Sequence, residues 1–327
     1  MEGIVSGKRG NIMKKVVFFE WTDQEEFIVS KYKIEIPFEY QAVDTVFELS
    51  SAQGYEVVSF KSQSQLSHAD LDQLKNSGCK HLALRCAGFD MLDVDYAASL
   101  NFKLSRVAAY SPESIAEFAL TLMLHLARKI NLQQQQHQAS DQSRGFKNMG
   151  FLLKGKQIGL YGYGKIAKHL AHVLRVGFGA QIYFFDPYVT GSHPDQQVES
   201  LAKLCSKVDI LSVHTPLTSE TKHSINRHTL ANLKPDFMLI NTSRGEVLKS
   251  QDVKTLYKKG KIKYLGLDVW GQHDKFDPDF LTLNSIQTNH VAFLTETSVY
   301  QMIVQTLQSI QGPISKENLL PLNYSQH

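Results

Sequence analysis

The chain has 327 residues, of which 43% are hydrophobic and 20% charged, with 35 basic and 32 acidic side chains. This length favours two domains, and the composition is that of a globular protein. No apolar run approaches the roughly 18 residues of a membrane span, and the near balance of charge leaves no basic stripe for nucleic acid. We therefore expect neither a membrane protein nor a nucleic-acid-binding protein.

Three scattered cysteines, Cys79, Cys86 and Cys205, lack the spacing of a metal site. An odd number of separated thiols is typical of a reducing compartment. The polar first 11 residues carry no hydrophobic signal core. We expect a cytoplasmic protein without a metal site.

Strand-like and helix-like patterns alternate from residue 14 to about residue 105. The expected strands cover residues 16–19, 55–60 and 81–85, and the expected helices cover residues 44–53, 69–77 and 93–100. Such alternation is typical of a parallel sheet with helices on its faces. These residues are expected to form the first domain, spanning 14–108.

A long apolar helix is predicted next, with Ser111 as its N-cap and Pro112 in its first turn, running from Ile115 to about Ile130. A second alternation follows, with strands expected at residues 157–161, 181–185, 210–213, 237–240 and 264–267. The last helix, about 296–310, can return to the first domain because chain ends often lie close together. The pattern predicts an α/β fold of two Rossmann-like domains with doubly wound parallel sheets.

The sequence GYGKIA at residues 162–167 follows an apolar strand and precedes a helical stretch. It matches the dinucleotide fingerprint, in which the first glycine makes the turn and the second admits the pyrophosphate to a helix N-terminus. Asp186 ends the next strand, where a carboxylate accepts hydrogen bonds from the ribose and repels a 2′-phosphate. With no arginine nearby, NAD is favoured over NADP. The residues expected at this turn are Gly162, Gly164, Lys165 and Ile166.

Arg244 follows the strand at 237–240, at the sheet edge where such folds bind ligands. A guanidinium grips a carboxylate through two hydrogen bonds and polarises an adjacent carbonyl. His290 follows another short apolar segment, and an imidazolium there can give a proton to an alkoxide formed by hydride addition. Together they indicate reduction of a small 2-keto acid.

Several stretches coincide with one family. They are LRCAGFD at 84–90, AYSPE at 109–113, GYGKIA at 162–167, VHTPLT at 213–218, INTSRG at 240–245, GLDV at 266–269 and HVAF at 290–293. Through them the chain resembles the D-isomer-specific 2-hydroxyacid dehydrogenases over nearly its whole length. Within that family it is most similar to the fermentative D-lactate dehydrogenases of bacteria.

The resemblance implies a substrate domain of residues 14–108 and 300–327, an NAD-binding domain of residues 109–299, and an active site in the cleft that closes to exclude water. It implies that Arg244 binds substrate and that His290 is the acid/base. Tyr110 and the backbone of Ala87 and Gly88 would line the carboxylate pocket. The cofactor would be bordered by Asp186, His214, Thr215, Pro216, Thr242, Ser243 and Asp268. A homodimer or higher homo-oligomer is implied by the helix after Pro112.

One position departs from the family. A glutamate that pairs with the catalytic histidine is expected five residues after Asp268, and this chain has His273 there. A carboxylate favours the charged imidazole, whereas a second histidine can lower its pKa. We therefore expect the reduction rate to fall off at lower pH than is usual for the family, with Asp274 as a possible substitute.

Three alternatives remain open on the sequence. The substrate can be a bulkier aliphatic or phenyl keto acid, whereas phosphoglycerate is disfavoured because no regulatory domain follows. The chain can instead be a nucleotide-sensing binding protein, as the corepressors of this superfamily are. A methyltransferase would leave Arg244 and His290 unexplained.

Overall fold

The computed structural model describes residues 14–142, 145–271, 278–280 and 282–320. The chain divides into two compact units. Unit 1 combines Met1–Ser111 with Leu294–His327, and unit 2 is the continuous segment Pro112–Phe293. Each unit has its own sheet and its own cores.

The sheet of unit 1 has five parallel strands in the order β2-β1-β3-β4-β5. Their bounds are β1 Lys15–Phe18, β2 Glu39–Ala42, β3 Val57–Phe60, β4 His81–Leu84 and β5 Lys103–Arg106. The central strands are apolar because helices cover both faces. All five strands point the same way, so the loops that follow them share one edge of the sheet.

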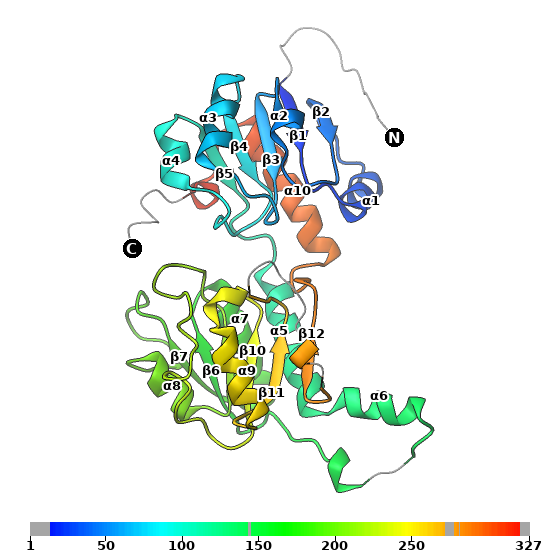
Figure 1. Ribbon diagram of the computed structural model, residues 1–327, viewed down its shortest axis with the longest axis vertical. Helices are drawn as coiled ribbons and strands as arrows, with labels where there is room; N and C mark the ends of the chain where they lie inside the picture. Colours follow the sequence, from blue (N-terminus) through cyan, green and yellow to red (C-terminus); the bar gives the residue numbers. More distant parts are fainter. Residues whose placement is uncertain (1–13, 143–144, 272–277, 281, 321–327) are drawn as a thin grey trace. The chain divides into compact units, whose positions relative to one another are not determined.

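Helices cover both faces of this sheet (Figure 1). They are α1 Asp23–Tyr32, α2 Leu49–Ala52, α3 His68–Asn76, α4 Val94–Ser99 and α10 Glu296–Gln311, followed by the short 3₁₀ helix η4 Lys316–Asn318. One core joins α3 and α4 to the sheet through Leu71, Leu74 and Ala97. The opposite core contains Ile28 of α1 and Ile303 of α10. The C-terminal helix thus completes the first unit.

The sheet of unit 2 has seven parallel strands in the order β12-β11-β10-β9-β6-β7-β8. Their bounds are β6 Gln157–Tyr161, β7 Gln181–Phe185, β8 Gln196–Gln197, β9 Ile210–Val213, β10 Phe237–Asn241, β11 Ile262–Leu267 and β12 Ser285–Gln287. The strand order runs outward in both directions from β6 and β9. This is the doubly wound arrangement, whose ligands bind beyond the carboxyl ends of the strands.

The helices of unit 2 lie on the two faces of its sheet, apart from the second helix, which extends away from the sheet (Figure 1). They are α5 Pro112–Ala127, α6 Ile130–Gln138, α7 Lys165–Phe178, α8 Leu201–Lys207 and α9 Ser250–Lys258, with 3₁₀ helices η1 Phe146–Asn148, η2 Gly245–Val247 and η3 Pro278–Phe280. One core contains α5 and α7, and the other contains α8 and α9. Within the described ranges, no helix has both the length and the apolar character to cross a membrane.

One predicted helix is shorter than expected. Residues 44–53 were expected to be helical, but the structure has only the four-residue α2 there. Its N-cap, Glu48, makes no side-chain hydrogen bond that would stabilise a longer helix. A longer helix that was not predicted is α1, where Thr22 and Glu25 form a capping box. That threonine-to-glutamate spacing was the sequence signal for α1.

Candidate active site

The turn between β6 and α7 can be made only with glycine at its first position. Gly162 has φ +86°, and a Cβ there would lie 2.9 Å from the backbone carbonyl of His214. Gly164, the N-cap of α7, has no heavy atom within 4 Å of a built Cβ. The first glycine therefore lets two loops approach closely, and the second leaves open space above the helix N-terminus.

The N-terminus of α7 is suited to a phosphate group. The first N–H groups of a helix have no partner inside the helix, and its dipole favours negative charge at that end. The first turn, which begins with Lys165 and Ile166, contains no acidic residue. A pyrophosphate at Gly164 would meet the N–H groups at the start of α7, whose first turn carries no carboxylate of its own.

Asp186 follows β7 and is held against the same turn. Its carboxylate accepts hydrogen bonds from the backbone N–H of Tyr163 (2.8 Å) and of Tyr188 (3.0 Å). The ring of Tyr163 stacks on Phe184 with centroids 3.8 Å apart, and burial together with its hydrogen bond to Asp195 raises the pKa of its hydroxyl. The acidic residue expected at the ribose is thus fixed beside the glycine turn.

Two buried polar atoms just after the ends of β9 and β10 have no hydrogen-bond partner in the described part of the chain. They are Nε2 of His214 and Oγ1 of Thr242. Burial lowers the pKa of His214 to about 4, so its ring is neutral at physiological pH. Unsatisfied buried groups are uncommon and point to a missing partner. With the open space at Gly164, they fit a bound dinucleotide.

Arg244 follows β10 in a turn that Asn241 organises. The Asn241 side chain accepts from the N–H of Ser243 at 3.0 Å and donates to the carbonyl of Arg244 at 2.9 Å. Asn241 is fully buried, and Arg244 is half-buried. The guanidinium donates to the Ser243 carbonyl at 2.9 Å. The backbone of the arginine is therefore fixed at the sheet edge.

Gly245 allows this turn to touch the segment after β11. A Cβ at Gly245 would lie 1.3 Å from the carbonyl oxygen of Trp270, far closer than two non-bonded atoms can approach. The indole of Trp270 donates to the carbonyl of Thr288 at 3.0 Å. The segments that carry Arg244 and Asp268 therefore meet backbone to backbone.

Hydrogen bonds join the ends of β10, β11 and β12 beyond the regular sheet. The N–H of Asp268 donates to the Asn241 carbonyl at 2.9 Å, and the N–H of His290 donates to the Asp268 carbonyl at 2.8 Å. The strand end before Arg244 and the backbone of His290 are thus two hydrogen bonds apart. The structure brings these two predicted residues to one edge of unit 2.

Asp268 fixes the loop that carries His290. Its buried carboxylate accepts from the Thr288 hydroxyl (2.6 Å) and from the N–H groups of Val291 (2.9 Å) and Ala292 (2.8 Å). His290 has φ +54°, a left-handed conformation that costs energy unless surrounding contacts enforce it. The place expected for Asp268 beside the nicotinamide stays a prediction.

The substrate residues predicted in unit 1 lie after neighbouring strands. Ala87 and Gly88 follow β4, Tyr110 follows β5, and all three are half-buried. His273 and Asp274 lie outside the described residues. The expectation for the missing family glutamate therefore stays a prediction.

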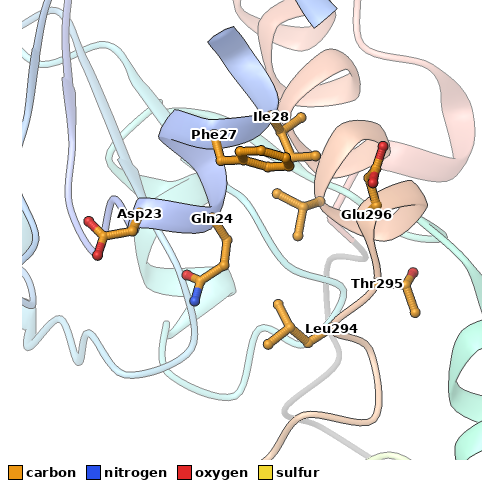
Figure 2. A pocket seen from close by; sticks show the side chains of 8 residues that line it. Asp23, Gln24, Phe27, Ile28, Leu294, Thr295 and Glu296 are labelled. Carbon is orange, nitrogen blue, oxygen red and sulfur yellow. The ribbon is translucent and has the colours of Figure 1, made fainter. Parts of the chain in front are cut away.

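A pocket of about 320 Å³ in unit 1 lies elsewhere (Figure 2). It opens between the first turns of α1 and of α10 and is lined by Phe27, Ile28, Leu294 and Val299, with polar side chains at the rim. None of the residues predicted for the site lines it. This pocket is separate from the strand ends described above.

Sequence reasoning missed three residues that shape the site. Asn241 builds the arginine turn, and Trp270 and Thr288 join neighbouring strand ends. Asn241 could have been found from its place at the end of a buried strand, where an asparagine side chain readily bonds to backbone two residues on. Trp270 and Thr288 carry no such local signal.

Comparison with known proteins identifies the family. Residues 120–292 match the family described as "D-isomer specific 2-hydroxyacid dehydrogenase, NAD binding domain". The D-lactate dehydrogenase of Escherichia coli (strain K12) is 36% identical over 282 residues, covering 80% of this chain and 85% of that protein.

Solved structures agree with the sequence comparison. The apo-structure of D-lactate dehydrogenase from Escherichia coli superposes with a TM-score of 0.79 at 32% identity, covering 90% of this chain and 95% of that chain. D-2-hydroxyisocaproate dehydrogenase also gives a TM-score of 0.79, at 27% identity, covering 90% and 94%. The chain is an NAD-dependent oxidoreductase that belongs to the D-isomer-specific 2-hydroxyacid dehydrogenase family.

Proposed function

We propose that this enzyme reduces pyruvate to D-lactate with NADH, using Arg244 to bind the substrate and His290 as the acid/base. The observation that carries the proposal is the pair of hydrogen bonds that joins the end of β10, next to Arg244, to the backbone of His290 through Asp268. A guanidinium and an imidazole at one sheet edge, beside a dinucleotide turn, match the needs of keto-acid reduction.

NADH supplies the hydride when it is bound. The guanidinium of Arg244 binds the planar keto acid and polarises its C2 carbonyl. His290 in its protonated form donates a proton to the oxygen of C2 as hydride reaches the carbon, so that the alkoxide never has to carry a full charge. Oxidation of the hydroxy acid runs in reverse, with neutral His290 accepting the proton.

The remaining predicted residues take roles that follow from their places. Unit 1 would bind the substrate carboxylate through the backbone of Ala87 and Gly88 and through Tyr110. In unit 2, the cofactor would be held at the turn by Gly162, Gly164, Lys165 and Ile166, at the ribose by Asp186, and along the strand ends by His214, Thr215, Pro216, Thr242 and Ser243. The neutral ring of His214 suits contact with an uncharged part of the cofactor.

The test is the loss of NADH absorbance with pyruvate between pH 5 and pH 9, with larger 2-keto acids and NADPH in parallel. The expected result is turnover with NADH, with pyruvate giving the highest kcat/KM. A preference for a branched aliphatic keto acid would favour the alternative of a bulkier substrate. The similarity to D-2-hydroxyisocaproate dehydrogenase is the reason to test it. Tight NADH binding without turnover on any keto acid would refute the proposal in favour of a nucleotide sensor.

We also propose that the enzyme is a cytoplasmic homodimer, with the segment after α5 at the interface. In this segment, Phe146 is 86% exposed, Met149 62% and Leu152 67%, which is unusual for large apolar side chains. In Figure 1, α6 extends from the end of α5 away from the sheet of its own unit. Phe146→Asp should convert a dimer to monomers in light scattering, and a monomeric wild type would contradict the proposal.

A further inference from the structure

Two backbone segments of unit 1 carry the residues that the proposed function assigns to the substrate carboxylate. Residues 86–89 follow β4 and residues 108–110 follow β5, and Leu84 pairs with Arg106 at the ends of these strands. The N–H of Val107 donates to the Cys86 carbonyl at 3.2 Å, so the pairing continues past the strands. We call residues 86–89 and 108–110 the carboxylate segments.

Arg106 holds the first carboxylate segment. Its Nη1 donates to the carbonyl of Ala87 at 2.8 Å, and its guanidinium lies 4.9 Å from the ring centroid of Phe89. A planar guanidinium can make both contacts at once, whereas a lysine ammonium offers a point charge without the flat face. The side chain therefore holds the backbone carbonyl before Gly88 and the aromatic ring after it.

Two amide side chains hold the second carboxylate segment. The N–H of Ala108 donates to Oδ1 of Asn318 at 3.0 Å, and Nε2 of Gln305 donates to the carbonyl of Ala109 at 3.2 Å. Nδ2 of Asn318 donates to Oε1 of Gln305 at 3.2 Å, so the two amides also bind each other. Asn318 is only 6% exposed. The two amides therefore hold the peptide groups on both sides of the Ala108–Ala109 bond, just before Tyr110.

We propose that Arg106, Gln305 and Asn318 are positioning residues that hold the carboxylate segments in the shape that binds the keto acid. The proposal rests on the proposed function and deepens it, because it makes α10 and η4 part of the substrate site. All three side chains act on backbone groups of the segments. Their loss should therefore weaken binding of the keto acid and leave the binding of NADH by unit 2 unchanged.

The experiment compares Asn318→Ala, Gln305→Met and Arg106→Lys with matched controls. Gln308→Met changes an exposed glutamine on the same helix, and Asn76→Ala changes an exposed asparagine at the end of α3. Each of the three substitutions at Arg106, Gln305 and Asn318 should raise KM for the keto acid about tenfold, which is the effect of losing one net hydrogen bond. The value of kcat should change less than about threefold, and KM for NADH less than about twofold, as for both controls.

A keto-acid-shaped inhibitor supplies a second measurement. The inhibition constant of oxamate should rise in parallel with KM, because both report binding of the same carboxylate. A loss confined to thermal stability, with both constants unchanged, would show a purely structural role and overturn the inference. If Asn318→Ala does not fold, Gln305→Met and Arg106→Lys decide the question by the same criteria.

The outcome for the wild type separates the two proposals. Turnover by the wild type with unchanged KM in all three variants would refute the inference alone. The absence of turnover on every keto acid would refute the proposed function, and the inference with it.

Discussion

Replacement of Gly245 by alanine tests whether the contact between the arginine turn and Trp270 sets the active geometry. The added Cβ would lie 1.3 Å from the Trp270 carbonyl oxygen and 1.8 Å from its carbon. Since real Cβ atoms essentially never approach another heavy atom within 3.0 Å, the two backbones must part by at least 1.7 Å, the difference between 3.0 Å and 1.3 Å. A displacement of about 1 Å at catalytic groups can cost a factor of about 100 in rate.

The expected result is a fall in kcat/KM for the keto acid of at least about 100-fold, measured by steady-state NADH oxidation. The NADH dissociation constant, from fluorescence titration, should rise less than kcat/KM falls, because the glycine turn and Asp186 lie on other strands and only the part of the cofactor near Thr242 and Ser243 adjoins the displaced turn. Gly177→Ala is the matched control, since a Cβ there meets nothing within 4 Å and alanine favours the interior of α7. Retention of kcat/KM within threefold in Gly245→Ala would refute the reasoning.

Three further predictions concern cofactor choice, the histidine loop and pH. Asp186→Asn keeps an acceptor but removes the charge that repels a 2′-phosphate, so the ratio of kcat/KM for NADH over NADPH should fall about tenfold; an unchanged ratio would contradict this. Asp268→Asn places an amide donor against one of the backbone N–H groups from which the Asp268 carboxylate accepts, so kcat should drop about 100-fold, and a normal kcat would count against the loop's role. Burial lowers the pKa of His81 to about 3 and of His214 to about 4, from 6.5. On acidification below pH 6.5 the unfolded chain binds these protons before the folded chain does. The free energy of unfolding should therefore fall by about 1.4 kcal/mol per pH unit for each histidine between pH 6.5 and pH 4. Urea unfolding at several pH values checks this, and a flat profile would contradict it.

The strands of unit 2 could be predicted because they are buried on both faces. Residues 157–161, 181–185 and 210–213 were expected as strands and are strands with the same bounds. A parallel strand between two layers of helices is apolar at most positions, and this leaves a nearly continuous signal. The end of each such strand then marks the sheet edge, which is why Asp186, Arg244 and His290 could be singled out.

The outer strand β2 and the helix α1 of unit 1 were harder to predict. The strand β2 has the sequence EYQA and is largely exposed, so it lacks an apolar run. The helix α1 has a weakly apolar face, and only its capping box distinguishes it. The helix predicted at residues 44–53 was too long because hydrophobic pattern alone does not mark where a helix begins, and Glu48 offers no side-chain cap.

Contacts between residues far apart in sequence could not be predicted at all. Asn318 and Ala108 are 210 positions apart, and nothing in either local sequence indicates that they meet. The same holds for Trp270 and Thr288, whose hydrogen bond depends on how two strands end. Motifs therefore identify the groups that do chemistry better than they identify the groups that hold them.

The discontinuous composition of unit 1 constrains how the chain is made. Its sheet is synthesised first, but one of its two faces is covered only in part, by α1, until α10, with Val299, Ile303 and Leu307, has left the ribosome. Unit 2 is continuous and can complete its cores earlier. Co-translational folding should thus finish the nucleotide-binding unit first, while the N-terminal sheet keeps part of one apolar face exposed until the last helix is made.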